Sequence, residues 1–419
     1  MGRQGLKVAA VQRVSRREEL YLEELLELCE AAGYEPAYII TQVRPPHPKY
    51  NIGPGKLEEL RNAVKTMGLS KVVFGGDVKP VQEYNLAKSL GVPVISRTQL
   101  ILEIFNRRAS SSEAKLQIRL AELRYELSRA KEKVRLAKKG EQPGFHGLGA
   151  YEAEVYYDEV KRQMHTIYQK LSAIKRRNSL VRAKRVEEGI PLVALTGYTN
   201  AGKSTLFNLL AGESRPVSPQ MFTTLSTTTR LTTFDGRKAY ISDTVGFIRN
   251  LPPLLIDAFN STLSEFIYAD LILLVVDVSE DVRNIQEKIN TCIATLREVG
   301  VVDVPILIVF NKADLCKNAA EYKIASLEFE QPYVVISALT GYNISQLCKM
   351  AGSMMGGYVR IRAVLENGGD SYELLSRLKE HGSLISLNYG SGGIEFEADA
   401  TVEMAEKIRR SASVFQVVG

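Results

Sequence analysis

One run of residues carries the types that bind the phosphates of a nucleotide. It reads Gly197-Tyr198-Thr199-Asn200-Ala201-Gly202-Lys203-Ser204, fits G-x-x-x-x-G-K-[ST] and is followed by Thr205. The apolar segment 192–196 precedes it and a helical pattern over 205–211 follows, which is the context in which this pattern binds phosphate. Glycines let several backbone N–H groups face phosphate oxygens, Lys203 reaches the β- and γ-phosphates, and the Ser204 hydroxyl coordinates Mg²⁺. A glycine turn with an exposed lysine is the less favoured alternative.

A second motif, Asp243-Thr244-Val245-Gly246, directly follows the strand-like segment 239–242. An aspartate at the end of that strand can hold Mg²⁺ through a water molecule, and the Gly246 N–H can contact the γ-phosphate. A D-x-x-G pattern is weak alone. Its position, one strand after the phosphate loop, makes it specific.

The segment 222–230 between these motifs is rich in hydroxyl groups, as a mobile switch segment is. We expect Thr224 to complete the coordination of Mg²⁺, with Thr228 as the competing candidate. The predicted catalytic residues are Lys203, Thr224 and Gly246, and the predicted metal ligands are Ser204, Thr224 and Asp243.

A third motif, Asn311-Lys312-Ala313-Asp314, predicts which base the site binds. The Asp314 carboxylate can accept hydrogen bonds from N1–H and the 2-amino group of guanine, whereas adenine would leave it unpaired at a cost of ~1–3 kcal/mol or more. Lys312 would lie across the purine, and the segment Ser337-Ala338-Leu339 can present the Ala338 N–H to guanine O6. With the earlier motifs, this order predicts a GTPase domain that takes GTP as substrate and GDP as product.

Phe247 follows D-x-x-G, where Ras-like enzymes carry a glutamine that orients the attacking water. A phenyl ring can neither donate nor accept a hydrogen bond. We therefore expect slow intrinsic hydrolysis, with the missing polar group supplied by backbone, a bound ion or a partner.

Composition bounds the class of protein. The chain has 419 residues, 45% hydrophobic and 24% charged, which predicts a globular protein of several domains. Its four cysteines form no C-x-x-C pair, and it has neither an apolar run near the ~18 residues that span a bilayer nor a signal-peptide core. We expect a cytoplasmic, monomeric protein without integral membrane association, and exclude the secreted, collagen-like and disordered classes.

The order of segments predicts four domains. Strand-like and helical segments alternate over 1–107 and 190–356, which favours two α/β domains with parallel sheets, the second a P-loop GTPase domain with a doubly wound sheet. Residues 357–419 follow the order β-α-β-β-α-β, which predicts a small ferredoxin-like α+β domain.

Residues 108–189 predict an antiparallel helical hairpin. Leucines from 116 to 127 and apolar residues from 160 to 174 repeat at spacings of 3 and 4, and a glycine-rich stretch, 140–149, separates the two runs. Residues 107–190 hold 20 Lys and Arg against 11 Asp and Glu, a net charge of +9 within a chain of +6. This arm suits an RNA partner; a solvated charged face is the alternative.

Gly53-Pro54-Gly55-Lys56 precedes another predicted helix. It could form a second anion site, for a nucleotide or an rRNA phosphate. A tight turn with a helix cap is the favoured interpretation.

Taken together, these motifs resemble those of the HflX GTPases, a family related to translation factors. The resemblance is carried by GYTNAGKST at 197–205, the threonines of 222–230, DTVGFI at 243–248, NKAD at 311–314 and SALTG at 337–341. It extends to 50–60 and to the junction 97–117. It implies binding to the large ribosomal subunit, with the N-terminal domain and hairpin facing rRNA, and GTP-dependent separation of stalled or idle ribosomes.

The tip of the hairpin departs from the family. Where bacterial members read much like RGPGETQLE, this chain has HGLGAYEAE at 146–154, so Ala150 replaces a glutamate. A GTP-timed ribosome-assembly factor and an NTP-driven rRNA-remodelling protein share the motifs and stay open as alternatives.

Overall fold

A computed structural model describes residues 5–15, 21–138, 149–213, 228–244, 246–249, 252, 255, 265–316, 320–390 and 392–418. The chain divides into two compact units. Among the described residues, one unit holds those up to residue 173 and the other holds most of the remainder.

The first unit begins with a parallel α/β domain. Its elements are β1 (Leu6–Val14), α1 (Leu22–Ala31), β2 (Tyr34–Val43), α2 (Pro54–Met67), β3 (Lys71–Phe74), α3 (Pro80–Leu90), β4 (Val94–Ile95) and α4 (Arg97–Arg108). The strands pair in parallel in the order β2-β1-β3-β4. Gly68 and Gly91 end α2 and α3 in the left-handed conformation, which glycine adopts without strain.

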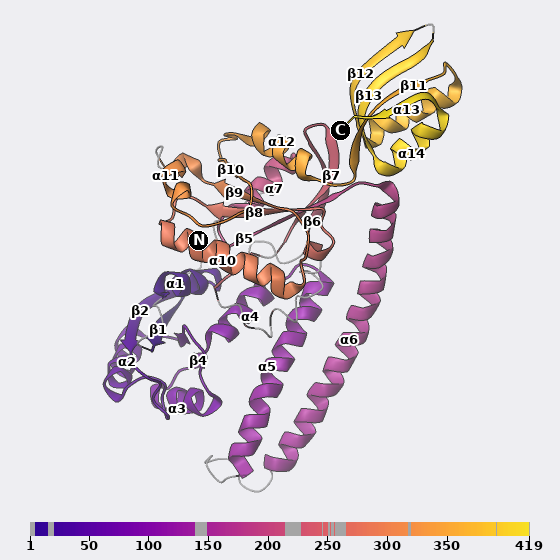
Figure 1. Cartoon of the computed structure of the whole chain (residues 1–419). Helices are drawn as coiled ribbons and strands as arrows, with labels where there is room; N and C mark the ends of the chain where they lie inside the picture. The colour runs from indigo at the N-terminus through magenta and orange to yellow at the C-terminus, as the bar shows by residue number, and fades with distance from the viewer. Residues whose placement is uncertain are drawn as a thin grey trace. The chain divides into compact units, whose positions relative to one another are not determined.

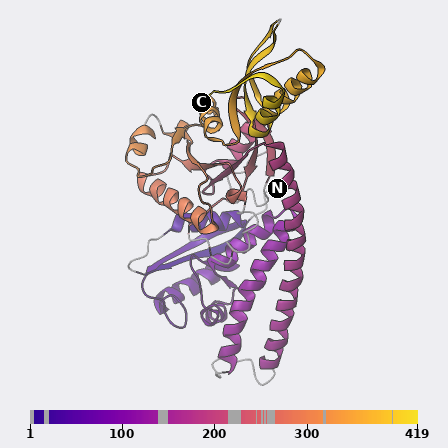
Figure 2. The same ribbon diagram turned by 45° about the vertical axis from the view of Figure 1, so that its right-hand side comes forward.

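Two long helices follow, α5 (Ser112–Lys138) and α6 (Gly149–Glu188), and they run side by side as an antiparallel pair (Figures 1 and 2). Leu120 and Leu123 of α5 pack against Val160 and Ile167 of α6. The 3-and-4 spacing of the sequence therefore does mark the seam between the helices. The predicted glycine-rich tip lies outside the described residues, except for Gly149.

The second unit contains a sheet in the order β10-β9-β8-β5-β7-β6. Its elements are β5 (Leu192–Gly197), α7 (Lys203–Ala211), β6 (Thr228–Phe234), β7 (Arg237–Asp243), β8 (Leu271–Asp277), α10 (Val282–Val299), β9 (Ile306–Asn311), η1 (Ala313–Leu315), α11 (Ala320–Ala325), β10 (Tyr333–Val335) and α12 (Ile344–Met354). β6 pairs with β7 antiparallel, and the other pairs are parallel. Side chains of α7 and α12 share one apolar core with the sheet, and α10 covers the opposite face (Figure 1).

The order of this sheet positions the site. In an open parallel sheet, ligands bind beyond the carboxyl ends of the strands. β5, β7, β8 and β9 end at Gly197, Asp243, Asp277 and Asn311. Three of the predicted motifs therefore meet at one edge, together with an aspartate that belongs to none of them.

The same unit ends in an antiparallel sheet covered by two helices. Its elements are β11 (Tyr358–Leu365), α13 (Gly369–His381), β12 (Ser383–Gly390), β13 (Gly393–Thr401), α14 (Val402–Ser411) and β14 (Ala412–Val417). The strand order is β12-β13-β11-β14. Arg237, at the start of β7, pairs with the buried carboxylate of Asp399 at 3.0 Å.

The predicted fold class, α/β with a mostly parallel sheet behind the phosphate loop, is confirmed. The four domain boundaries stay a prediction, because the contacts divide the chain into two units. Within the described part of the chain, no helix is long and apolar enough to cross a membrane.

Candidate functional site

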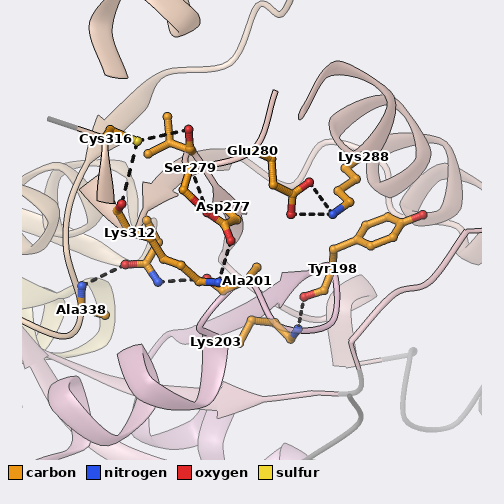
Figure 3. A network of polar contacts seen from close by, with 12 residues as sticks. Tyr198, Ala201, Lys203, Asp277, Ser279, Glu280, Lys288, Lys312, Cys316 and Ala338 are labelled. Carbon is orange, nitrogen blue, oxygen red and sulfur yellow. Dashed lines mark hydrogen bonds and ion pairs between the residues drawn. The ribbon is translucent and has the colours of Figure 1, made fainter. Parts of the chain in front are cut away.

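The phosphate loop connects β5 to α7 and encloses its lysine. Lys203 is the first residue of α7 and is only 7% exposed. Its Nζ donates to the carbonyl oxygens of Gly197 at 3.0 Å and Tyr198 at 2.7 Å, the second of which Figure 3 shows. Burial lowers the pKa of Lys203 to about 8, although the charge of Asp243 opposes this shift. The ammonium is thus held inside the loop by carbonyl groups and lacks full solvation.

Gly202 permits the loop to close. Its φ of +92° is a left-handed conformation, and a Cβ atom there would lie 2.2 Å from Nδ2 of Asn311. A side chain would therefore both strain the backbone and displace an amide of the base-binding motif. Thr199, in the middle of the loop, is 7% exposed, and its hydroxyl has no hydrogen-bond partner among the described residues. An unpaired buried hydroxyl is a donor that a phosphate oxygen would satisfy.

The predicted metal ligands lie together where the structure describes them. The Ser204 hydroxyl donates to Oδ2 of Asp243 at 3.0 Å. Asp243 ends β7 and is 2% exposed. A hydroxyl and a carboxylate are hard oxygen donors of the kind Mg²⁺ takes, so this pair fits that ion. Thr224, the third predicted ligand, lies outside the described residues.

The segment after Asp243 is bonded to the phosphate loop. The N–H of Phe247 donates to Gly197 O at 3.0 Å, and the N–H of Thr199 donates to Phe247 O at 2.9 Å. The ring of Phe247 is 2% exposed and packs near Phe266, with centroids 6.2 Å apart. A Cβ atom on Gly246 would come 2.7 Å from Lys203 Nζ, so this glycine lies directly beside the lysine. The side chain of Phe247 is therefore directed into the core.

Asn311 connects the phosphate loop to the base-binding loops. Its Nδ2 donates to Ala201 O at 2.9 Å, and its Oδ1 accepts the Ala338 N–H at 2.9 Å. The Ala338 N–H is the group we predict at guanine O6, so a bound base would have to share it with Asn311. Asn311 is 2% exposed, which fixes the amide in this role.

The carboxylate predicted to read guanine is already oriented. Asp314, in η1, accepts a hydrogen bond from the Ser337 hydroxyl at 2.6 Å. The same hydroxyl accepts the Thr340 N–H at 3.2 Å, so Ser337 orders both the aspartate and its own loop. The side chain of Leu339 is 79% exposed. The structure thus joins Asp314 to Ser337, and Asn311 to Ala338, among the residues predicted to bind the base.

Lys312 has a partner that the motif does not name. Its Nζ lies 2.6 Å from Oδ2 of Asp277, at the end of β8 (Figure 3). Sequence reasoning did not assign Asp277. The available signal was its position at the carboxyl end of an apolar strand, beside the strand that ends in Asn311.

The other glycine-lysine turn has a different environment. The Gly53 N–H donates to Oε1 of Gln42 at 2.9 Å, and Lys56 pairs with Glu59 at 2.7 Å. Pro54 occupies the first position of α2 and has no N–H. These contacts favour the capped turn over a second anion site.

Protein-family models match three consecutive stretches of the chain. Residues 19–106 match a GTP-binding GTPase N-terminal domain, residues 108–185 a GTP-binding GTPase middle region, and residues 192–312 a 50S ribosome-binding GTPase. Curated relatives extend this match over most of the chain. GTPase HflX of Thermococcus kodakarensis is 46% identical over 320 residues, which are 76% of this chain and 72% of the relative.

The chain belongs to the HflX family of GTPases. GTPase HflX of Methanocaldococcus jannaschii is 44% identical over 81% of this chain and 84% of its own length. GTPase HflX of Escherichia coli is 38% identical over 81% and 80%. A crystal structure of a GTP-binding protein from Sulfolobus solfataricus in complex with GDP is 29% identical, covers 83% of this chain and 98% of its own, and superimposes with a TM-score of 0.45.

The predicted family and activity are thereby confirmed. Like other HflX GTPases, the protein binds GTP and hydrolyses it to GDP and phosphate.

Proposed function

We propose that this HflX GTPase binds the large ribosomal subunit and, in a GTP-dependent way, splits stalled or idle ribosomes. The observation that carries the proposal is the match of residues 192–312 to a family of 50S ribosome-binding GTPases, in a chain that also has a basic helical arm. Binding to rRNA needs cations that reach solvent.

The helical arm offers such cations. Its seam is apolar, so its charged side chains point outward. The exposed basic residues on the described faces of α5 and α6 are Lys115, Arg119, Lys161, Arg162, Lys170, Lys175, Arg176 and Arg177. Phosphate contacts from such a face release counterions, so affinity should fall steeply with salt.

Sucrose-gradient cosedimentation with purified large subunits tests the partner. The full-length protein with a non-hydrolysable GTP analogue should pellet with the subunits, and the protein with GDP should pellet less. Changing Lys175, Arg176 and Arg177 to Gln should weaken binding and flatten its salt dependence. Changing the exposed Lys407, Arg409 and Arg410 of α14 to Gln is the matched control and should change neither. If the affinity for large subunits changed neither with salt nor with the triple substitution, an rRNA-facing arm would be contradicted.

The outcome on intact ribosomes decides between the activities. Release of separated subunits from assembled ribosomes in the presence of GTP supports splitting. Accumulated subunit precursors on depletion, without splitting in vitro, would support the assembly factor instead. The rRNA-remodelling alternative uses the N-terminal domain as a second NTPase. The capped Gly53–Lys56 turn gives it no support.

Within the GTPase domain, we propose that Lys203 and the loop 197–205 bind the phosphates and that Ser204, Asp243 and Thr224 hold Mg²⁺. The ion would neutralise charge that develops on the phosphates. The hydrogen bond between Ser204 and Asp243 supports this assignment. Nucleotide affinity measured with and without EDTA tests it, and Ser204→Ala should abolish the difference.

We propose that the ribosome supplies the polar group that orients the attacking water, which Phe247 cannot provide. Its ring is buried against Phe266 and cannot orient water. Single-turnover GTP hydrolysis should therefore be slow alone and faster with large subunits. Equal rates would overturn this part of the proposal.

We also propose that the protein acts in the cytoplasm as a monomer. Its four cysteines are free thiols, three of them buried, which suits a reducing compartment. Light scattering coupled to size-exclusion chromatography tests the oligomeric state, and cell fractionation tests the location.

A further inference from the structure

Asp277 is a polar residue at the nucleotide edge of the sheet that no motif claims. It ends β8, and its side chain is 10% exposed. Oδ2 lies 2.6 Å from Lys312 Nζ. Oδ1 accepts the N–H of Ser279 at 2.9 Å and its hydroxyl at 2.5 Å. Each carboxylate oxygen therefore has a partner, and the carboxylate is fixed on both sides.

Lys312 is the residue whose freedom this contact removes. Its backbone is left-handed, with φ of +66°. Its side chain is long and 25% exposed. Immobilising such a side chain costs rotamer entropy. Because the ion pair with Asp277 forms before the nucleotide binds, this entropy is already lost on folding. It therefore does not lower the affinity for the nucleotide.

The turn after β8, residues 278–280, also contacts the segment that follows Lys312. The thiol of Cys316 donates to Val278 O at 3.3 Å. Lys323, in α11, donates to the carbonyl oxygens of 278, 279 and 280 at 3.1, 3.0 and 2.7 Å. The turn after β8 is thus a fixed platform, and Asp277 is its contact with the base-binding motif.

The turn after β8 is also connected to the phosphate loop, through Lys288 of α10. Glu280 pairs with Lys288 of α10 at 2.5 Å. The Lys288 ammonium lies 5.1 Å from the centroid of the Tyr198 ring (Figure 3). This contact leads to the phosphate loop and does not involve Lys312.

We propose that Asp277 is a positioning residue for guanine-nucleotide binding, which holds Lys312 in place to cover the purine ring. The proposal rests on the proposed role of the 311–314 loop in base binding. Asp277 would act by preorganising the Lys312 side chain before the nucleotide binds. Without the carboxylate, the lysine would sample other rotamers, and its ammonium would be more strongly hydrated.

A double-mutant cycle on the full-length protein tests this proposal, with GDP affinity as the readout. Asp277→Asn should raise the Kd for GDP about tenfold, the loss expected for one charge-assisted contact. Lys312→Met should raise it at least as much. Because Asp277 acts through Lys312, Asp277→Asn should add almost nothing in the Lys312→Met background. In steady state, KM for GTP should rise while kcat stays unchanged.

Each result either supports or overturns the proposal. As the control, Asp281→Asn makes the same chemical change at an exposed aspartate that caps α10 in the same turn, and it should leave the Kd for GDP unchanged. Effects that add in the double variant, or an Asp277→Asn variant that binds GDP normally, would overturn the role of Asp277 alone. A Lys312→Met variant that binds GDP normally would overturn the base-loop assignment as well. Should Asp277→Asn fail to fold, Ser279→Ala loosens the same carboxylate and should show a smaller effect that also vanishes in the Lys312→Met background.

Discussion

Two turns of this chain bring glycine and lysine to the start of a helix, and the two lysines have opposite environments. Lys203 is buried and bonded to carbonyl oxygens of its own loop. The side chain of Lys56 is 36% exposed and pairs with Glu59, three residues later on the same helix. The first lysine keeps its positive charge among carbonyl groups inside the loop, and the second has its charge satisfied by a carboxylate on the surface.

The backbone explains the difference. Five residues separate Gly197 from Lys203, enough to form a loop around a phosphate, whereas two separate Gly53 from Lys56. The Gly53 N–H is taken by Gln42, and the next residue is a proline. Glycine content and a positive charge therefore do not suffice for a phosphate site. Loop length and backbone donors that face the ligand decide the outcome.

The largest effect should come from the two lysines themselves. Lys203→Ala should lower GTP affinity at least about a hundredfold, because a charge-assisted contact to two phosphates is lost from a buried site. Lys56→Ala should change it less than about twofold, since surface ion pairs contribute little. Fluorescence titration with a labelled GTP analogue measures both. A comparable loss in both variants would show that the N-terminal turn also binds nucleotide.

The second largest effect should come from Gly202. Gly202→Ala places a methyl group against the Asn311 amide and keeps a left-handed backbone that costs alanine about 1–2 kcal/mol. We expect a lower melting temperature and GTP affinity reduced about tenfold or more. Differential scanning calorimetry with and without GDP separates the two consequences. A Gly202→Ala variant with normal GDP affinity would show that the loop tolerates a different shape.

Nucleotide binding should depend on pH through Lys203. The pKa of its ammonium is about 8 in this structure because the group is buried. Phosphate oxygens favour the protonated form, so binding raises that pKa and takes up a proton as pH passes 8. Affinity should fall about fourfold between pH 7 and 8.5. Isothermal titration calorimetry in buffers of different ionisation enthalpy measures the uptake, and no uptake at pH 8 would contradict the lowered pKa.

The smallest effect should come from Gly55. A Cβ atom there meets no atom within 4 Å, and the residue lies in the first turn of α2. Gly55→Ala should therefore stabilise the fold by about 0.4–1 kcal/mol and leave GTP affinity unchanged. Thermal unfolding checks the stability, and the titration used for the lysine variants checks the affinity. Destabilisation would mean that the turn needs its glycine for a reason other than space.

Much of this architecture is predictable because the strands are apolar and each motif ends one of them. The phosphate loop, Asp243 and Asn311 follow β5, β7 and β9, so their meeting at one edge follows from a parallel sheet. The seam of the helical pair follows from spacing alone. Each of these signals is a short pattern that can be recognised within one stretch of the sequence.

The contacts that sequence reasoning missed join residues distant in sequence. Asp277 meets Lys312 across two strands, and Gln42 occupies the Gly53 N–H from the end of β2. The pairing of Phe247 with the phosphate loop uses backbone atoms, so no side-chain pattern marks it. Such partners are chosen by tertiary packing, which a single sequence does not reveal.

The amide of Asn311 spans two binding surfaces with one rigid group of atoms. One end donates to Ala201 O in the loop proposed to bind the phosphates, and the other accepts the Ala338 N–H in the loop proposed to bind the base. An amide so held cannot adjust one end without moving the other. By linkage, any change that one half of a nucleotide makes through this amide in the affinity for the other half is reciprocal.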